Sequence, residues 1–209
     1  MARKRPPTTC EDIIQRRDEL FEALSKESDR GVVLISASFL DEALEALLRA
    51  RFSIRHPKSK SSINPLFDTF GPLHFFSAKI KICYAMDLIG KWMYRDLEIV
   101  RKLRNDFAHS VGAARFDLPE AVQLTERLKA ADLAVTTITK EVAGTKKAKK
   151  IEIAKKSRSK PTKANMERVR FEMSVSFIGA LLYFLTRILS SDASLQDKEN
   201  IIESILLAK

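Results

Sequence analysis

The chain has 209 residues, of which 45% are hydrophobic and 31% are charged, and its net charge is +10. This composition is typical of a soluble globular protein that can bury a sizeable core. With only 6 Gly and 7 Pro, the chain lacks the many tight turns of an all-β fold. The two cysteines, Cys10 in a predicted tail and Cys83 in an apolar stripe, form no motif and are interpreted as reduced thiols.

Most of the positive charge is confined to two segments. Between Lys146 and Lys163 the sequence has nine Lys and Arg against one acid, Glu152, and the first residues add Arg3, Lys4 and Arg5. The rest of the chain is close to neutral. A basic surface is therefore expected on these segments and not on the folded body.

Apolar residues recur at helical spacing through most of the chain, and no stretch alternates long enough to predict a strand. Residues 1–10 are predicted as a disordered basic tail, and Arg30-Gly31 as a break between the first two helices. Helices are predicted over residues 11–28, 32–52, 73–89, 91–108, 119–142, 164–190 and 195–207. Gly90 is expected to cap the third of them. The fold class is therefore all-α, a single-domain helical bundle of about six to seven helices.

The predicted organisation has a helical core and an insertion. The core covers 11–143, a Lys-rich linker or insertion covers 144–163, and C-terminal helices over 164–209 pack on the core. No apolar signal region follows the basic start "MARKRPPTT". The apolar run between Glu172 and Arg187 is shorter than the roughly 20 residues that span a bilayer. We therefore expect a cytoplasmic protein without a membrane contact.

The stretch "KLRNDFAHS" (102–110) concentrates polar side chains at the end of the fourth predicted helix. On a helical wheel Arg104 falls inside the apolar arc of that helix, while Asn105 and His109, four apart, share a neighbouring face. A His that titrates near neutrality can move the proton of a ribose 2′-hydroxyl, and an Arg can stabilise charge on the phosphate. The alternative is structural, because basic residues also favour the negative end of the helix dipole.

"RNDFAH" (104–109) fits the Arg-x4-His pattern of the HEPN superfamily, all-α domains that include many RNA-cutting toxins. In that family the motif comes from the end of a helix, and two copies face each other across a homodimer. The resemblance implies a metal-independent endoribonuclease with Arg104 and His109 as its working pair and Asn105 in support.

The Lys-rich segment is the second candidate site, because clustered Lys and Arg bind nucleic-acid phosphates without reading sequence. It lacks interleaved aromatic residues for base stacking, and a solvated connector is an equally good interpretation. The residues concerned are Lys146, Lys147, Lys149, Lys150, Lys155, Lys156, Arg158 and Lys160. His56 and His74 have no Cys or acid at metal-ligand spacing, and no Gly-rich phosphate loop occurs, so neither a metal nor a cofactor is predicted.

A longer resemblance covers residues 64–109. Pro65-Leu66, Gly71-Pro72-Leu73, "IKICYAMDLIG" (80–90) and Tyr94 resemble the central block of the mannitol operon repressor family. The helices "GVVLISASFLDEALEALLRARF" and "FEMSVSFIGALLYFLTRIL" also fit that family's layout. The resemblance implies an all-α fold and transcriptional repression, with a partner protein in place of a clear DNA-reading motif. The Arg-x4-His pattern and the Lys-rich segment depart from the family.

The leading hypothesis is a cytoplasmic, homodimeric, all-α regulator whose basic segments contact nucleic acid or an acidic protein. The second is the metal-independent endoribonuclease, and the third is a protein-interaction module without either activity. A regulator does not need a reactive His109, whereas the nuclease needs Arg104 and His109 together in an open cleft.

Overall fold

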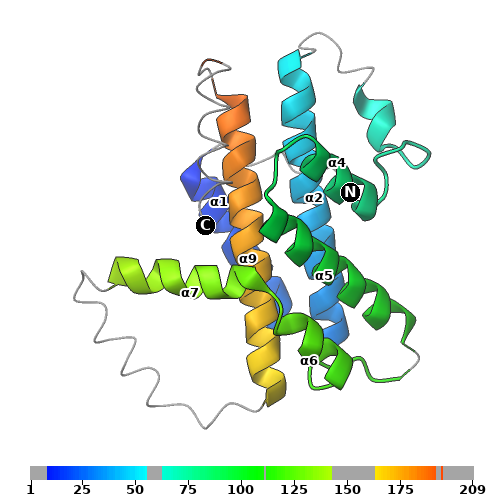
Figure 1. The fold of residues 1–209 in the computed structure, drawn as a ribbon, viewed down its shortest axis with the longest axis vertical. Helices are drawn as coiled ribbons and strands as arrows, with labels where there is room; N and C mark the ends of the chain where they lie inside the picture. Colours follow the sequence, from blue (N-terminus) through cyan, green and yellow to red (C-terminus); the bar gives the residue numbers. More distant parts are fainter. Residues whose placement is uncertain (1–8, 56–62, 111, 143–162, 192–193, 195–209) are drawn as a thin grey trace.

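A computed structural model describes residues 9–55, 63–110, 112–142, 163–191 and 194, and these ranges contain helices, turns and loops but no strand (Figure 1). The all-α prediction is therefore confirmed. The elements in chain order are α1 (Cys10–Ser25), α2 (Asp29–Arg55), the 3-10 helix η1 (Asn64–Phe67), α4 (Phe76–Ala85), α5 (Lys91–His109), α6 (Pro119–Thr125), α7 (Lys129–Val142) and α9 (Lys163–Ser190). The predicted helix 195–207 lies outside the described residues.

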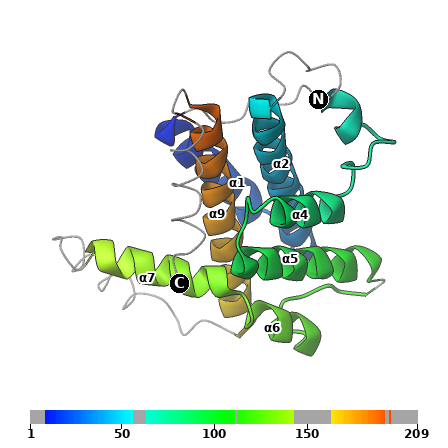
Figure 2. The same ribbon diagram turned by 45° about the horizontal axis from the view of Figure 1, so that its top comes forward.

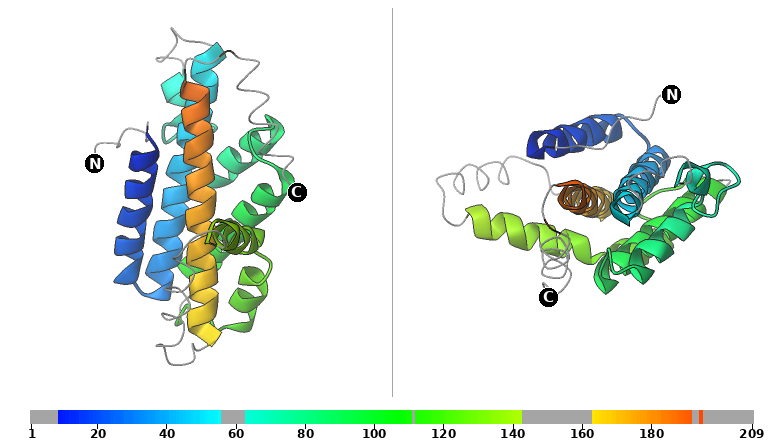
Figure 3. Two further views of the ribbon diagram at one scale, coloured as in Figure 1. Left: turned by 90° about the vertical axis from the view of Figure 1, so that its left-hand side faces the viewer. Right: turned by 90° about the horizontal axis from the view of Figure 1, so that it is seen from above.

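The two longest helices, α2 and α9, pack side by side and form the centre of the bundle. α1 covers one flank of this pair, and the α4–α5 hairpin packs on the other side of α2 (Figures 2 and 3). α7 crosses α9 at a steep angle. By length and composition α9 could cross a membrane, but half of its apolar stretch is buried inside the bundle, which identifies it as a core helix.

The first two helices begin at other residues than the sequence predicts, and a capping box fixes the start of α1. The Thr9 side chain accepts a hydrogen bond from the Asp12 amide at 3.0 Å, and the Asp12 carboxylate accepts one from the Thr9 amide at 2.9 Å. This capping box starts α1 at Cys10, so Cys10 belongs to a helix and not to the tail. The predicted break at Arg30-Gly31 is also wrong, because α2 already starts at Asp29.

The third predicted helix is shorter than expected, and Gly90 has a different role. α4 ends at Ala85, and Asp87 adopts a left-handed conformation with φ 53°. The Leu88 amide then donates to the Cys83 carbonyl at 2.9 Å, and the Asp87 amide donates to the Tyr84 carbonyl at 3.1 Å. This pair of bonds is a Schellman motif with Asp in the position that Gly usually occupies. Gly90 instead is the N-cap of α5.

The single helix predicted over 119–142 is two helices, α6 and α7, separated at residues 126–128. The buried Asp96 carboxylate of α5 accepts hydrogen bonds from the amides of Lys129 at 3.2 Å and Ala130 at 2.7 Å, which caps the start of α7. Arg170 of α9 donates to the carbonyls of Thr125 at 2.9 Å and Leu128 at 3.1 Å. Both ends of the break are therefore stabilised by side chains from distant helices.

Candidate functional site

The motif predicted from the sequence lies at the C-terminal end of α5. Arg104 and His109 are exposed and Asn105 is partly buried, and the Arg104 guanidinium donates to the Asn105 side-chain carbonyl at 3.0 Å. The expectation that Arg104 lies on the buried stripe is wrong. It sits at the edge of the arc, near the helix end, and its guanidinium turns to Asn105 on the solvent side.

The loop that follows α5 is anchored by the start of α2. Arg30 donates from the same nitrogen to the carbonyls of Ser110 at 2.7 Å and Gly112 at 2.8 Å. The Asp29 carboxylate accepts from the Phe116 amide at 3.0 Å. The fully buried Phe116 ring packs against aromatic rings of α5 and α9. The end of α5 and the loop that Arg30 and Asp29 hold form a corner of the bundle, and the exposed motif lies at this corner.

The chemistry available at this corner is limited. The His109 side chain makes no hydrogen bond with another described residue, so nothing described orients its ring. Within the described ranges no group of three or more His, Cys, Asp or Glu could hold a metal ion. The eight basic residues predicted to contact nucleic acid, from Lys146 to Lys160, lie outside the described residues.

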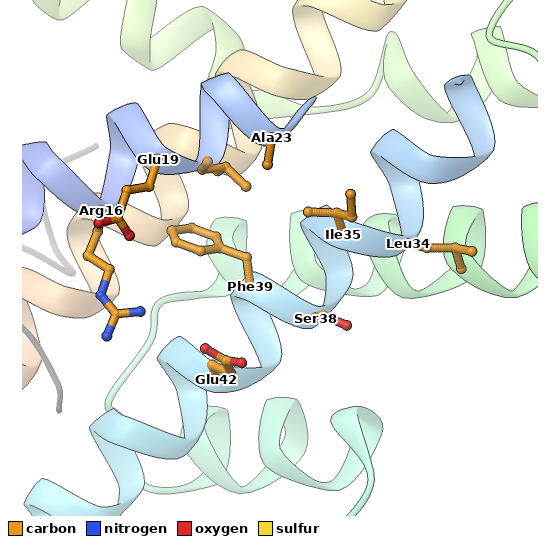
Figure 4. A pocket seen from close by; sticks show the side chains of 9 residues that line it. Arg16, Glu19, Ala23, Leu34, Ile35, Ser38, Phe39 and Glu42 are labelled. Atoms are coloured by element: carbon orange, nitrogen blue, oxygen red, sulfur yellow. The ribbon is translucent and has the colours of Figure 1, made fainter. Parts of the chain in front are cut away.

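A groove between α1 and α2 is a concave feature of the described residues that the sequence did not predict (Figure 4). It has a volume of about 390 Å³ and opens widely to solvent. Its floor is apolar and its rim carries charged and polar side chains. The floor consists of Leu20, Ala23, Leu34, Ile35 and Phe39, and the rim of Arg16, Glu19, Ser38 and Glu42.

The Phe39 side chain lines this groove and packs against α9. The Phe39 ring meets the Tyr183 ring edge-on, with centroids 5.7 Å apart. A Cβ atom at Gly179 would overlap the Phe39 ring, so glycine is needed for this close approach. The Arg16 guanidinium lies 6.0 Å from the centre of the Tyr183 ring, and burial raises the pKa of that phenol to about 12. Tyr183 is therefore neutral at physiological pH and acts in packing.

A buried ion cluster joins α2 to α4. The Lys79 ammonium lies 2.8 Å from the Asp41 carboxylate and 3.1 Å from that of Glu45, and Arg49 bonds Glu45 at 2.9 Å. Burial raises the pKa of Asp41. Burial also raises that of Glu45, but hydrogen bonds from Arg49 and Lys79 outweigh it and the net pKa is lowered. These charges neutralise one another, so the cluster positions α4 and offers no reactive group.

The described residues form an all-α bundle, and the open groove between its helices α1 and α2 has a largely apolar lining with charged residues beside it.

The chain belongs to the mannitol repressor family, whose model matches residues 16–178. The mannitol operon repressors of Escherichia coli strains K12 and O6:H1 are each 29% identical over 80 residues, which is 38% of this chain and 41% of the relative. The matched part therefore spans less than half the length of these curated relatives. The X-ray structure of the MtlR–HPr complex from Escherichia coli is 19% identical, covering 85% of this chain and 99% of that one, with a TM-score of 0.49.

Proposed function

We propose that this protein is a cytoplasmic transcriptional regulator of the repressor type that acts by binding a protein partner. The observation that carries the proposal is the family match over residues 16–178, which includes every residue that lines the groove. The sequence has no recognisable helix-turn-helix. Regulation through a partner is therefore favoured over direct reading of DNA.

The α1–α2 groove is the proposed partner site. Its apolar floor suits one or two apolar side chains of a helix or extended segment, and Glu19 and Glu42 on the rim suit a basic residue beside them.

Binding is tested by calorimetry with the full-length protein. HPr is the first probe, since it is the partner in the solved Escherichia coli complex. Ala23→Glu and Ser38→Arg place charge in the groove, whereas Ala85→Glu and Ser53→Arg place the same charge at exposed sites away from both the groove and the Arg104–His109 motif. We expect the groove variants alone to lose about tenfold or more in affinity, because the charge is desolvated on binding. Equal affinity of all four variants for HPr contradicts the groove as the binding site. If the wild type does not bind HPr, HPr is excluded as the partner.

The regulatory function is tested in a deletion strain by measuring transcripts. Loss of a repressor raises the transcripts of a defined gene set. The wild type and the two control variants should restore repression, and the groove variants should not. Transcripts that do not change on deletion contradict the repressor function and leave an interaction module without it.

Contact with nucleic acid is a separate part of the proposal, assigned to the Lys-rich segment 144–163. It is supported by the nine basic residues against one acid between 146 and 163. Replacing Lys149, Lys150, Lys155 and Lys156 with Gln should lower the slope of log affinity against log salt by about 3 to 4 for duplex DNA. An unchanged slope contradicts this assignment.

A metal-independent endoribonuclease is the second candidate, because Arg104 and His109 are both exposed and Asn105 orients the Arg104 guanidinium. His109 would remove the 2′-hydroxyl proton as the 2′-oxygen attacks the phosphorus, and Arg104 would stabilise the charged phosphate. The bond to the 5′-oxygen would then break, and that oxygen would take a proton from water. The test is RNA cleavage in EDTA that leaves 2′,3′-cyclic phosphate ends. It should be lost in His109→Ala and Arg104→Ala but kept in Lys102→Ala, an exposed control on the same helix. The endoribonuclease hypothesis also requires a homodimer, and light scattering tests this by measuring the molar mass in solution.

A further inference from the structure

A stacked pair of tyrosines lies on the α4–α5 hairpin. The ring of Tyr84, in the last turn of α4, stacks on that of Tyr94 in the first turn of α5, with centroids 4.5 Å apart and an interplanar angle of 28°. Tyr84 is 39% exposed and Tyr94 is partly buried, and neither hydroxyl forms a hydrogen bond with a described residue. Part of the paired rings is therefore open to solvent, where another flat ring system can stack.

Three basic side chains lie around this pair. Lys81 lies three residues before Tyr84 on α4, Lys91 lies three residues before Tyr94 on α5, and Arg95 follows Tyr94. Three residues measure about 4.5 Å along a helix axis. The two helices pack against each other in opposite directions (Figure 2). Lys81 and Lys91 therefore lie on opposite sides of the rings along the length of the hairpin.

These cations are not neutralised within the described part of the protein. All three side chains are exposed, and none of them forms an ion pair with a described residue. Asp87, in the turn between the helices, is the one acidic residue between positions 81 and 95. By contrast, basic residues of α1 and α9 pair with nearby acids. The hairpin therefore presents positive charge on both sides of an exposed aromatic surface.

These features favour a single-stranded nucleic acid over other anions. Its bases have flat faces that stack on aromatic side chains, and its backbone supplies a negative charge at each nucleotide. A duplex keeps its bases stacked on one another, and an acidic protein has no bases, so either would contact the cations alone. A single phosphate would leave one side of the tyrosine pair without an anion.

We propose that the Tyr84–Tyr94 pair and the cations beside it form a binding site for single-stranded nucleic acid. A base stacks on the open part of the tyrosine pair, and the phosphates on either side of that base contact Lys81, Lys91 and Arg95. The site is separate from the Lys-rich segment, and it does not include the Arg-x4-His motif. The inference therefore does not rest on the proposed regulatory function or on RNA cleavage.

The charges are tested with two triple variants of the full-length protein that lose the same charge. The site variant combines Lys81→Gln, Lys91→Gln and Arg95→Gln. The control variant changes three exposed residues at the end of α1 and at the α6–α7 break, and combines Lys26→Gln, Arg127→Gln and Lys129→Gln. Fluorescence anisotropy measures the binding of two single strands of about 12 nucleotides, a 2′-O-methyl oligouridylate that resists cleavage and an oligothymidylate.

The site variant should lower the slope of log affinity against log salt by about 2, because each phosphate contact on a single strand contributes about 0.7. The control variant should keep the wild-type slope. Equal slopes in the two variants overturn the proposal, because binding then depends on net charge alone. A wild type that binds neither strand also overturns it, whereas binding of only one strand supports the site and shows which sugar it accepts.

The stacking is tested with single aromatic changes. Tyr84→Ala should weaken single-strand binding about tenfold, because the base loses its stacking partner, and Tyr84→Phe should keep the affinity. Phe70→Ala is the control, since Phe70 is fully exposed on a loop outside the hairpin. The affinity for a duplex of the same length should be equal in all these proteins. A loss in Tyr84→Ala that is no larger than in Phe70→Ala, or that is as large for the duplex, overturns the proposal.

Crosslinking gives a readout on the wild type, which is needed because Tyr84→Ala also removes a contact between α4 and α5. An oligonucleotide that contains 4-thiouridine is irradiated in the complex, and mass spectrometry identifies the crosslinked peptides. Crosslinks within residues 81–95 are expected. Crosslinks that lie only elsewhere in the chain overturn the proposal.

Discussion

Asp96 is the residue whose removal tests how the α6–α7 break is held. Its side chain is 1% exposed, and its two oxygens accept hydrogen bonds from the Lys129 and Ala130 amides. Asp96→Ala removes both acceptors. Loss of an N-cap costs about 0.5–2 kcal/mol, and a buried amide without a partner costs about 1–3 kcal/mol. Burial also raises the pKa of Asp96, so removing the carboxylate relieves some desolvation. We expect a net loss of about 2 kcal/mol.

The assay is urea unfolding monitored by circular dichroism, and thermal unfolding is measured in parallel. For a chain of this size, a loss of about 2 kcal/mol lowers Tm by roughly 4–8 °C. Asp106→Ala is the matched control, since Asp106 is exposed on the same helix, and it should change stability by no more than about 0.5 kcal/mol. A loss in Asp96→Ala as small as in the control would refute the capping argument. Hydrogen exchange locates the effect, because the amides at the start of α7 should exchange faster.

Three further predictions use the same unfolding assay. Lys79→Met leaves the Asp41 carboxylate without its cation, while Glu45 keeps its ion pair with Arg49. This change should cost about 3 kcal/mol, whereas Lys81→Met at an exposed site should cost little. Asp87→Gly should stabilise the protein by up to about 1 kcal/mol, because glycine adopts the left-handed conformation at the end of α4 without strain. Burial raises the pKa of Asp96 above its ordinary 3.8, so the extra stability that comes from its protonation is fully present below pH 3.8 and is lost as the pH rises through the raised value. Compared with Asp96→Asn, the wild type should therefore gain stability as the pH is lowered toward 4, and a parallel pH dependence of the two proteins contradicts this sign.

The helices that the sequence predicts best are those with a strong apolar period. α5 was expected over 91–108 and runs from Lys91 to His109, and α9 was expected over 164–190 and runs from Lys163 to Ser190. The break between α6 and α7 could not be predicted in this way. Its capping groups come from Asp96, 33 residues before Lys129, and from Arg170, 45 residues after Thr125. No local window of sequence contains these partners.

The candidate sites also differ in how far local sequence predicts them. The exposure of His109 follows from its place in the last turn of α5, whereas the exposure of Arg104 depends on how its guanidinium reaches Asn105. The groove is made by surfaces of two helices, and its depth at Phe39 depends on the missing side chain of Gly179. A glycine within a long apolar helix was the one sequence signal that a close contact with another helix occurs there.

The two candidate functions are physically separable, because they use different parts of α2. Asp29 and Arg30 at its start hold the corner that carries Arg104 and His109, whereas Leu34 to Glu42 form one wall of the groove. A charge placed at Ala23 or Ser38 does not touch that corner, and His109→Ala does not touch the groove. Repression that is lost only in the groove variants therefore assigns regulation to partner binding, even if RNA cleavage is also found. Repression that is lost only in His109→Ala and Arg104→Ala assigns it to RNA cleavage, and the groove then has no part in it.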